Sequence, residues 1–157
     1  MPNPLVGLFV GALVERPARR MGPAALVARL EAGRAGVPAL LEGAGDAAAV
    51  KQLRHVIGIE RWGQRRLRVA LGDVAYQRDE HQAYLPSEAE TRAQLLERFD
   101  AVRVETVDLA RRLVAEARLG EKVEHNALGP VTALGWLRYL QMHGEWEARR
   151  ARSIKTS

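Results

Sequence analysis

Residues 95–113, LLERFDAVRVETVDLARRL, decide the fold class of this 157-residue chain. Six positions recur there at alternating spacings of four and three residues: Leu95, Phe99, Val102, Thr106, Leu109 and Leu113. This spacing forms a seam along one side of a helix, which is how the helices of a bundle pack against one another. Ser87 and Glu90 fit a capping box, so we predict a helix that begins after Ser87 and ends near Gly120.

Two earlier segments also carry helical patterns. Residues 23–42 place apolar side chains at helical spacing, and Pro38 within them predicts a kink. Residues 46–71 do the same, with Asp46 as the predicted N-cap. A long connection, residues 74–86, separates this second helix from the third. Its length permits a crossover between helices that are not neighbours.

A fourth helical segment begins near Thr132, which is a fair N-cap, and its apolar positions continue to Ile154. No segment shows the strict alternation of a strand, so any strands are expected to be short and to lie in the loops. Four helices of this length around one core predict an all-α bundle. We expect a single domain, residues 1–157, with its core in residues 23–154.

An N-terminal extension, residues 1–22, precedes this core. Its residues 5–14 are apolar, and Asn3 and Pro4 before them predict the start of a short buried helix. Pro17 is expected to end or bend that helix. The apolar run is too short to cross a bilayer, and its arginines follow it, so it does not resemble a secretory signal.

The composition narrows the classes of function. The chain is 47% hydrophobic but only 5% aromatic, so its core must be mostly aliphatic, which favours helices. There is no cysteine, which excludes disulfides, zinc–thiolate sites and cysteine nucleophiles. Any metal must therefore be held by His, Asp, Glu or water. This composition is compatible with a cytoplasmic protein.

The charge balance does not favour a nucleic-acid partner. The net charge is +5, but 19 acidic residues are mixed among the 24 basic ones along the predicted helices. No aromatic side chains are interleaved with a basic patch, as they would be in a single-strand binder.

Three side chains form a candidate metal site. His143 and Glu147 are four residues apart and therefore project from one face of the last helix, in a stripe that also contains Tyr139. His55 lies in the second helix. An imidazole and a carboxylate on one helix, completed by a histidine from a facing helix, make a three-ligand set for a divalent metal.

A structural interpretation of the same residues stays open. Arg150 lies one turn beyond Glu147 and is an alternative partner for its carboxylate. A single helical histidine such as His55 is commonly a packing residue. The two remaining histidines, His81 and His125, lie in predicted loops and are expected to be solvated, although His81 is the main alternative as a metal ligand.

Two stretches resemble the DinB/YfiT superfamily. Residues 53–62, LRHVIGIERW, are similar to its second helix, where a histidine precedes an acidic and an aromatic residue. Residues 128–132, LGPVT, together with residues 143–147, HGEWE, are similar to the start and end of its last helix. Residues 26–42 also show the Leu and Arg spacing of its first helix, so the resemblance spans about residues 23–154.

The resemblance implies a DinB-like four-helix bundle with up-down-down-up topology, usually a homodimer. Members bind a divalent metal, such as zinc or nickel, through three histidines. His55 and His143 match the first two of these, whereas Glu147 stands at the third position. Two histidines and one carboxylate also form a zinc arrangement and suit iron or manganese, so the substitution leaves the identity of the metal open.

The resemblance also implies an activity. Known relatives include S-transferases that use a low-molecular-weight thiol such as bacillithiol or mycothiol, so we expect a metal-dependent transferase that activates a thiol for a small-molecule substrate. Glu60, Tyr139 and Arg150 are the candidate assisting residues. The alternative is a non-catalytic stress-response or binding bundle with a degenerate metal site.

Overall fold

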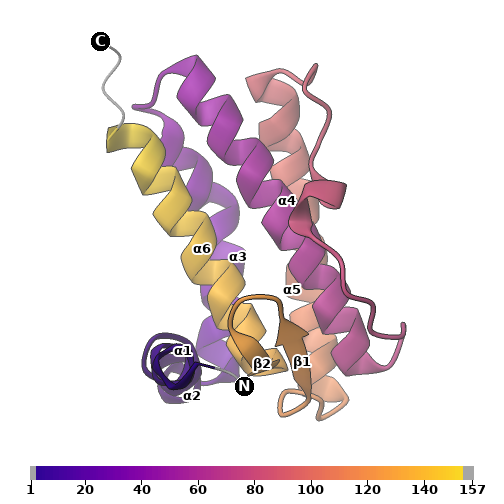
Figure 1. Cartoon of the computed structure of the whole chain (residues 1–157). Coiled ribbons are helices and arrows are strands. Elements are labelled where there is room, and N and C mark those ends of the chain that lie inside the picture. The colour runs from indigo at the N-terminus through magenta and orange to yellow at the C-terminus, as the bar shows by residue number, and fades with distance from the viewer. Residues whose placement is uncertain (1–2, 154–157) are drawn as a thin grey trace.

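Four long helices form the body of the protein in a computed structural model that describes residues 3–153 (Figure 1). They are α3 (Pro23–Leu41), α4 (Asp46–Leu71), α5 (Arg92–Ala115) and α6 (Ala133–Ser153). Helices α4 and α3 each pack against both α5 and α6. The predicted all-α class is confirmed, apart from one short hairpin. Ile154, predicted to extend the last helix, lies outside the described residues.

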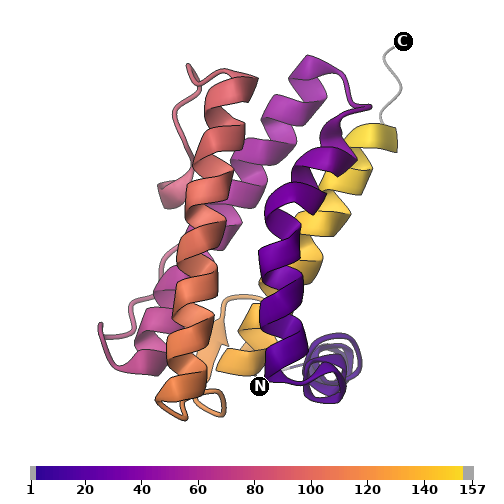
Figure 2. The same ribbon diagram turned by 180° about the vertical axis from the view of Figure 1, so that it is seen from behind.

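The long connection between α4 and α5 sets the directions of the helices. In Figures 1 and 2, α3 and α6 run in one direction and α4 and α5 in the other. Ion pairs show that α4 and α5 are parallel, because Glu60 meets Arg103 and Asp73, just beyond α4, meets Arg112. The connection therefore has to return along the length of α4 before α5 begins.

This connection is held against α4 by Asp79. The indole Nε1 of Trp62 donates to the Asp79 main-chain oxygen and to Asp79 Oδ1, at 3.2 and 3.0 Å, and Arg66 Nη2 lies 2.8 Å from Oδ1. The hydroxyl of Tyr84 donates to Oδ2. Burial by itself raises the pKa of Asp79, but the hydrogen bonds from Tyr84, Arg66 and Trp62 outweigh it and hold that pKa below its usual range.

The capping positions of two helices differ from those predicted. The capping box of α5 is Thr91 with Gln94 rather than Ser87 with Glu90, because the chain turns once more before the helix begins. The N-cap of α4 is Gly45, and Asp46 is the first helical residue. The predicted kink at Pro38 does not interrupt α3, which runs unbroken to Leu41.

A β-hairpin joins α5 to α6. Strands β1 (Lys122–His125) and β2 (Gly129–Thr132) are antiparallel, with His125 opposite Gly129. Helix α5 ends at Ala115, earlier than predicted, and Ala117 beyond it has a left-handed backbone with φ of 54°. Thr132 accepts a hydrogen bond from the Gly135 amide at 3.0 Å, which confirms the predicted start of the last helix.

The N-terminal extension is more than one short helix. Helix α1 (Pro4–Val10) begins as predicted, with the Asn3 side chain accepting from the Leu5 amide, but the chain then passes through a π-helix (Gly11–Glu15) into α2 (Arg16–Met21). The prediction that this apolar segment is buried is wrong for most of it. Only Val10 and Val14 are buried, while four large apolar side chains stay exposed: Leu5, Leu8, Phe9 and Leu13. No helix among residues 3–153 is long and apolar enough to span a membrane.

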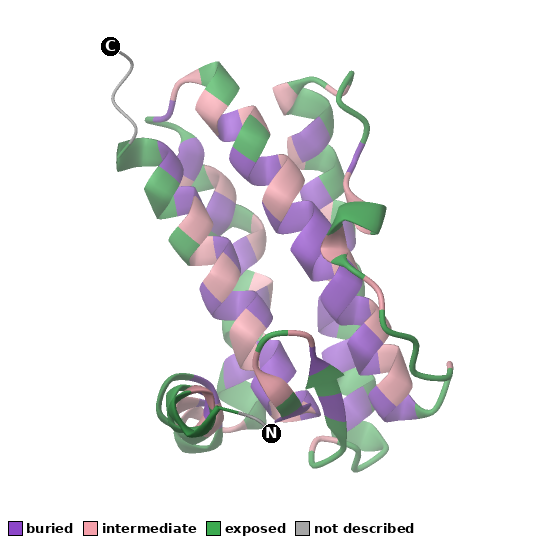
Figure 3. Cartoon of the chain, viewed as in Figure 1, coloured by how far each residue is buried: buried purple, intermediate pink, exposed green. Residues whose placement is uncertain are grey.

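Apolar side chains fill the space between the four long helices. Figure 3 shows the buried residues along their inward faces. Two clusters make up this core, one around Trp62 and Trp136 and the other around Leu53 and Phe99. The core therefore holds α4 and α6 side by side, which is the contact that positions the candidate site.

Candidate metal centre

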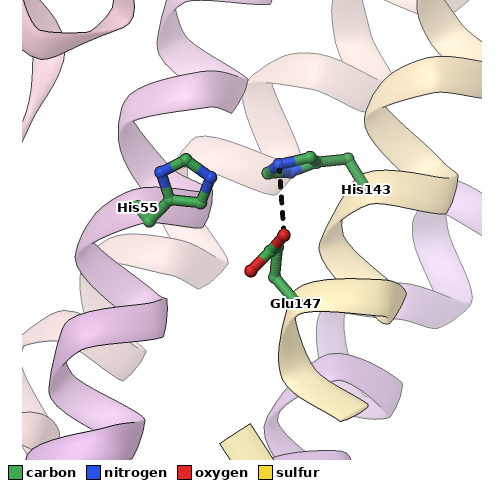
Figure 4. A group of neighbouring side chains, drawn as sticks. All are labelled: His55, His143 and Glu147. Atoms are coloured by element: carbon green, nitrogen blue, oxygen red, sulfur yellow. Dashed lines mark ion pairs between the residues drawn. The ribbon is translucent and has the colours of Figure 1, made fainter. Parts of the chain in front are cut away.

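The three predicted metal ligands lie together between α4 and α6. His55 projects from α4, and His143 and Glu147 project from one face of α6 (Figure 4). Each offers a ligand atom, and these atoms all lie within 4.8 Å of one another. Because His143 and Glu147 are one helical turn apart, the local helix places them together, whereas His55 arrives through the packing of α4 on α6.

The candidate ligand atoms are farther apart than they would be around a bound metal ion, by distances that small side-chain movements can close. His143 Nε2 lies 4.0 Å from Glu147 Oε1, and the rings of His55 and His143 have centroids 5.1 Å apart. Ligand atoms of a tetrahedral zinc site are about 3.4 Å apart, since each bond is about 2.1 Å long. Closing the wider gaps requires movements of up to about 1.4 Å, which rotation of these side chains can supply.

Both imidazoles are in the protonation state that metal binding requires. Burial, together with the neighbouring His55, His81 and His125, lowers the pKa of His143 to about 3. Burial also lowers the pKa of His55, against the opposing effect of the Glu147 carboxylate. The two rings are therefore neutral at pH 7, so a metal ion would not compete with a proton.

Glu147 lies near both His143 and its predicted alternative partner Arg150. Its Oε1 lies 4.0 Å from His143 Nε2 and 3.3 Å from Arg150 Nη1. Its side chain is 13% exposed, whereas that of Arg150 is 71% exposed. Exposed ion pairs contribute about 1 kcal/mol or less, so the Arg150 contact is weak enough to be exchanged for a bond to a metal.

Of the predicted assisting residues, Tyr139 is close to the ligands and Glu60 is engaged elsewhere. The Tyr139 ring lies 5.7 Å from that of His143, and burial raises the pKa of Tyr139 to about 12, so it is a neutral phenol. Glu60 is buried, with Oε1 2.6 Å from Arg103 Nε and Oε2 2.9 Å from Nη2, and it also accepts from Thr106. Both of its oxygens therefore have protein partners.

Two histidines behave differently from the sequence-based expectation. His81 is only partly exposed, because the 3-10 helix His81–Tyr84 packs on α4, and its ring stands edge-on to that of His55 with centroids 5.3 Å apart. Gly58 permits this approach, since a Cβ there would lie 2.7 Å from Leu85 Cδ2. No periodic pattern in the sequence of this connection could have predicted that His81 lies beside His55.

His125 is buried at 8% exposure, although it was expected to be solvated. Its Nδ1 accepts from the Ala127 and Leu128 amides, both at 3.2 Å. Its ring packs among Trp62, Trp136 and Tyr139 with centroids 5.0–5.1 Å away, and burial lowers the pKa of His125 to about 4. It supports the wall of the site as a neutral side chain.

Comparison of the chain with known protein families, with curated proteins and with solved structures found no match.

Proposed function

We propose that this protein is a DinB-like metalloenzyme that binds one divalent ion through His55, His143 and Glu147. The observation that carries the proposal is the meeting of three ligand atoms within 4.8 Å between two helices. The antiparallel packing of α4 and α6 and the long connection after α4 support the DinB-like topology. Zinc and nickel are the first candidates, with iron and manganese as alternatives, because the ligands are two imidazoles and a carboxylate.

The proposed reaction is an S-transfer, in which an activated low-molecular-weight thiol is joined through its sulfur to a small-molecule substrate. A bound zinc or nickel ion would supply Lewis acidity and would lower the pKa of a coordinated thiol. His55 and His143 provide neutral nitrogen donors, and Glu147 contributes a negative charge that partly balances the ion. Tyr139 holds its proton and so could donate a hydrogen bond at the ligands. Arg150 is exposed beside Glu147 and offers a positive charge to an anionic group of the substrate.

Metal titration of tag-free, chelator-treated protein tests this proposal. We expect one equivalent of Zn²⁺ or Ni²⁺ per chain by calorimetry, and a stabilisation of about 2.7 kcal/mol when free metal is 100-fold above its Kd. His55→Ala and His143→Asn should abolish the stabilisation. Glu145→Gln, which changes a carboxylate on the same helix outside the site, should keep it. Protein that gains no stability from zinc, nickel, iron or manganese is not a metalloenzyme.

A second function is favoured by one contact. The 3.3 Å pair between Glu147 and Arg150 is what a degenerate site in a non-catalytic stress-response or binding bundle would retain. Arg150→Ala separates the two functions. In a metal centre this variant binds metal at least as tightly as the parent, since a competing cation is removed. In a degenerate bundle neither protein binds metal. The implied homodimer and the cytoplasmic location remain predictions.

A further inference from the structure

A small cavity lies beside the metal ligands, between the N-terminal extension, the hairpin and α6. Its volume is about 190 Å³. We call it the α6 cavity. Five of its lining side chains are apolar, and they are Phe9, Val14, Leu128, Met142 and Trp146. The others are His125, Tyr139 and His143, so one proposed metal ligand forms part of the wall.

The walls select against a charged occupant. Among residues 3–153, no carboxylate, ammonium or guanidinium group lines the α6 cavity. Moving an ion from water into apolar surroundings without a partner costs several kcal/mol, whereas an apolar molecule gains by leaving water. The cavity therefore favours an uncharged, mostly apolar body.

The size of the cavity limits that body to about one ring. A protein cavity of about 150 Å³ lined by aliphatic and aromatic side chains holds benzene. At about 190 Å³, the α6 cavity has room for a benzene ring with one or two additional atoms. Phe9 and Trp146 are 46% and 48% exposed while they also line the cavity, so both aromatic side chains border solvent as well as the cavity.

The N-terminal wall of the cavity is held in place by Glu15. Its Oε1 accepts from the Thr132 amide at 2.9 Å and its Oε2 from the Thr132 hydroxyl at 2.8 Å, next to the start of α6. The adjacent Val14 is fully buried. The π-helix that carries both residues is thus anchored to α6, and the cavity is preformed, as small-molecule sites usually are.

We propose that the α6 cavity binds a small uncharged aromatic or aliphatic group of the substrate, next to His143. The proposal rests on the proposed function for its chemistry, since His143 belongs both to the metal centre and to the cavity wall. It assigns the N-terminal extension a role in substrate binding and explains why Phe9 and Trp146 are left exposed.

Binding of toluene and benzoate to metal-free protein tests the cavity without the metal. We expect toluene to shift amide signals of residues around the cavity in nuclear magnetic resonance spectra, and benzoate to bind at least tenfold more weakly. Leu128→Trp fills the cavity and should weaken toluene binding at least tenfold while Zn²⁺ affinity stays within twofold. Leu13→Trp makes a similar change on an exposed residue outside the cavity and should alter neither.

A second variant guards against misfolding of Leu128→Trp. Phe9→Ala removes an exposed side chain and opens the rim, so it should admit naphthalene, which the parent excludes.

In Co²⁺-loaded protein, benzyl mercaptan should produce its charge-transfer band at a concentration at least tenfold below that required for 2-mercaptoethanol, and Leu128→Trp should abolish this preference.

The outcomes separate this proposal from the proposed function. Parent protein that binds metal but not toluene overturns the cavity as a substrate site and leaves the metal centre standing. Protein that binds toluene but no metal supports the cavity and overturns the metalloenzyme. A dimer that forms with rising concentration and displaces toluene would show that a second copy covers this surface, which also overturns the proposal.

Discussion

In the proposed metal site, Glu147 is the residue expected to decide which metal binds most tightly. Imidazole suits nickel and zinc, whereas carboxylates suit manganese and magnesium. We expect Glu147→His to raise the affinity for Ni²⁺ relative to Mn²⁺ on the order of tenfold, because it replaces the only carboxylate of the set by a third imidazole. Competitive titration with a chromogenic chelator measures the ratio. Glu145→His serves as the control, and an unchanged Ni²⁺/Mn²⁺ ratio in Glu147→His would mean that position 147 is not a ligand.

Glu60 and Arg103 form a buried pair whose role is structural. Both side chains are almost fully buried, and the guanidinium also donates to the Leu30 main-chain oxygen at 3.2 Å. Gly33 makes room for it, since a Cβ there would overlap Arg103. Removing one partner leaves the other charge uncompensated, so Glu60→Gln should lower the free energy of unfolding by about 3–5 kcal/mol.

Urea denaturation measures this loss, and the double variant Glu60→Met/Arg103→Met is its control. The double variant should lower the free energy of unfolding by less than Glu60→Gln does, because it leaves no unpaired charge in the core. Zinc affinity of Glu60→Gln should stay within a few-fold of the parent, as expected for a residue outside the metal centre. If Glu60→Gln kept the parent's free energy of unfolding but lost metal binding or activity, Glu60 would have the assisting role predicted from the sequence.

At the scale of elements, one carboxylate attaches the connection to α4. Asp79 accepts from Trp62 and Tyr84 and neutralises Arg66, whose side chain is buried between the rings of Trp62 and Tyr76. Asp79→Ala leaves that guanidinium without its counter-charge, and we expect a loss of about 2–3 kcal/mol in stability. Hydrogen exchange of residues 74–86 should rise more than that of α5.

Asp108→Ala is the matched control for this change, because it removes an exposed carboxylate that is paired only along its own helix. It should leave hydrogen exchange of the connection unchanged. If Asp79→Ala also left that exchange unchanged, contacts other than Asp79 would hold the connection. The same experiment reports on His81, which belongs to this connection and lies beside His55.

At the scale of the whole molecule, two buried neutral histidines predict sensitivity to acid. The pKa of His125 is lowered to about 4 and that of His143 to about 3, against about 6.5 in an unfolded chain. Between these pKa values the unfolded state binds more protons than the folded state. The contribution of the two histidines to the free energy of unfolding is therefore fully present above pH 6.5 and falls as the pH decreases towards 4. Over this range each histidine can lower the free energy of unfolding by up to about 3 kcal/mol.

Urea midpoints of metal-free protein at pH 7, 6, 5 and 4 measure this dependence. His125→Phe keeps an aromatic ring among Trp62, Trp136 and Tyr139 but cannot bind a proton, so its stability should fall less steeply over that range. Stability that is constant from pH 7 to pH 5 in the parent would show that neither histidine is held neutral by burial. Asp79, whose pKa is lowered, adds a further loss only below about pH 4.

The patterns that could be read from the sequence are those set by near neighbours in the chain. The seam of α5, the end of α4 at Leu71 and the caps at Asn3 and Thr132 follow from spacings of three and four residues or from one turn of backbone. The pairing of His143 with Glu147 is local in the same sense. Even within this range, competing caps such as Ser87 and Thr91 could not be ranked, because both offer a hydroxyl before a helix.

The sequence by itself determined the helices and the face of α6 on which His143 and Glu147 meet, because hydrogen bonds and side-chain contacts within a helix depend on residues a few positions apart. Only the tertiary structure decided that His55 joins them, that His81 approaches and that Glu60 is committed to Arg103. These are contacts between residues far apart in the chain, and they form only when apolar side chains pack α4 against α5 and α6. Core packing therefore completes the proposed metal site, whereas helix geometry alone brings two of its three candidate ligands together.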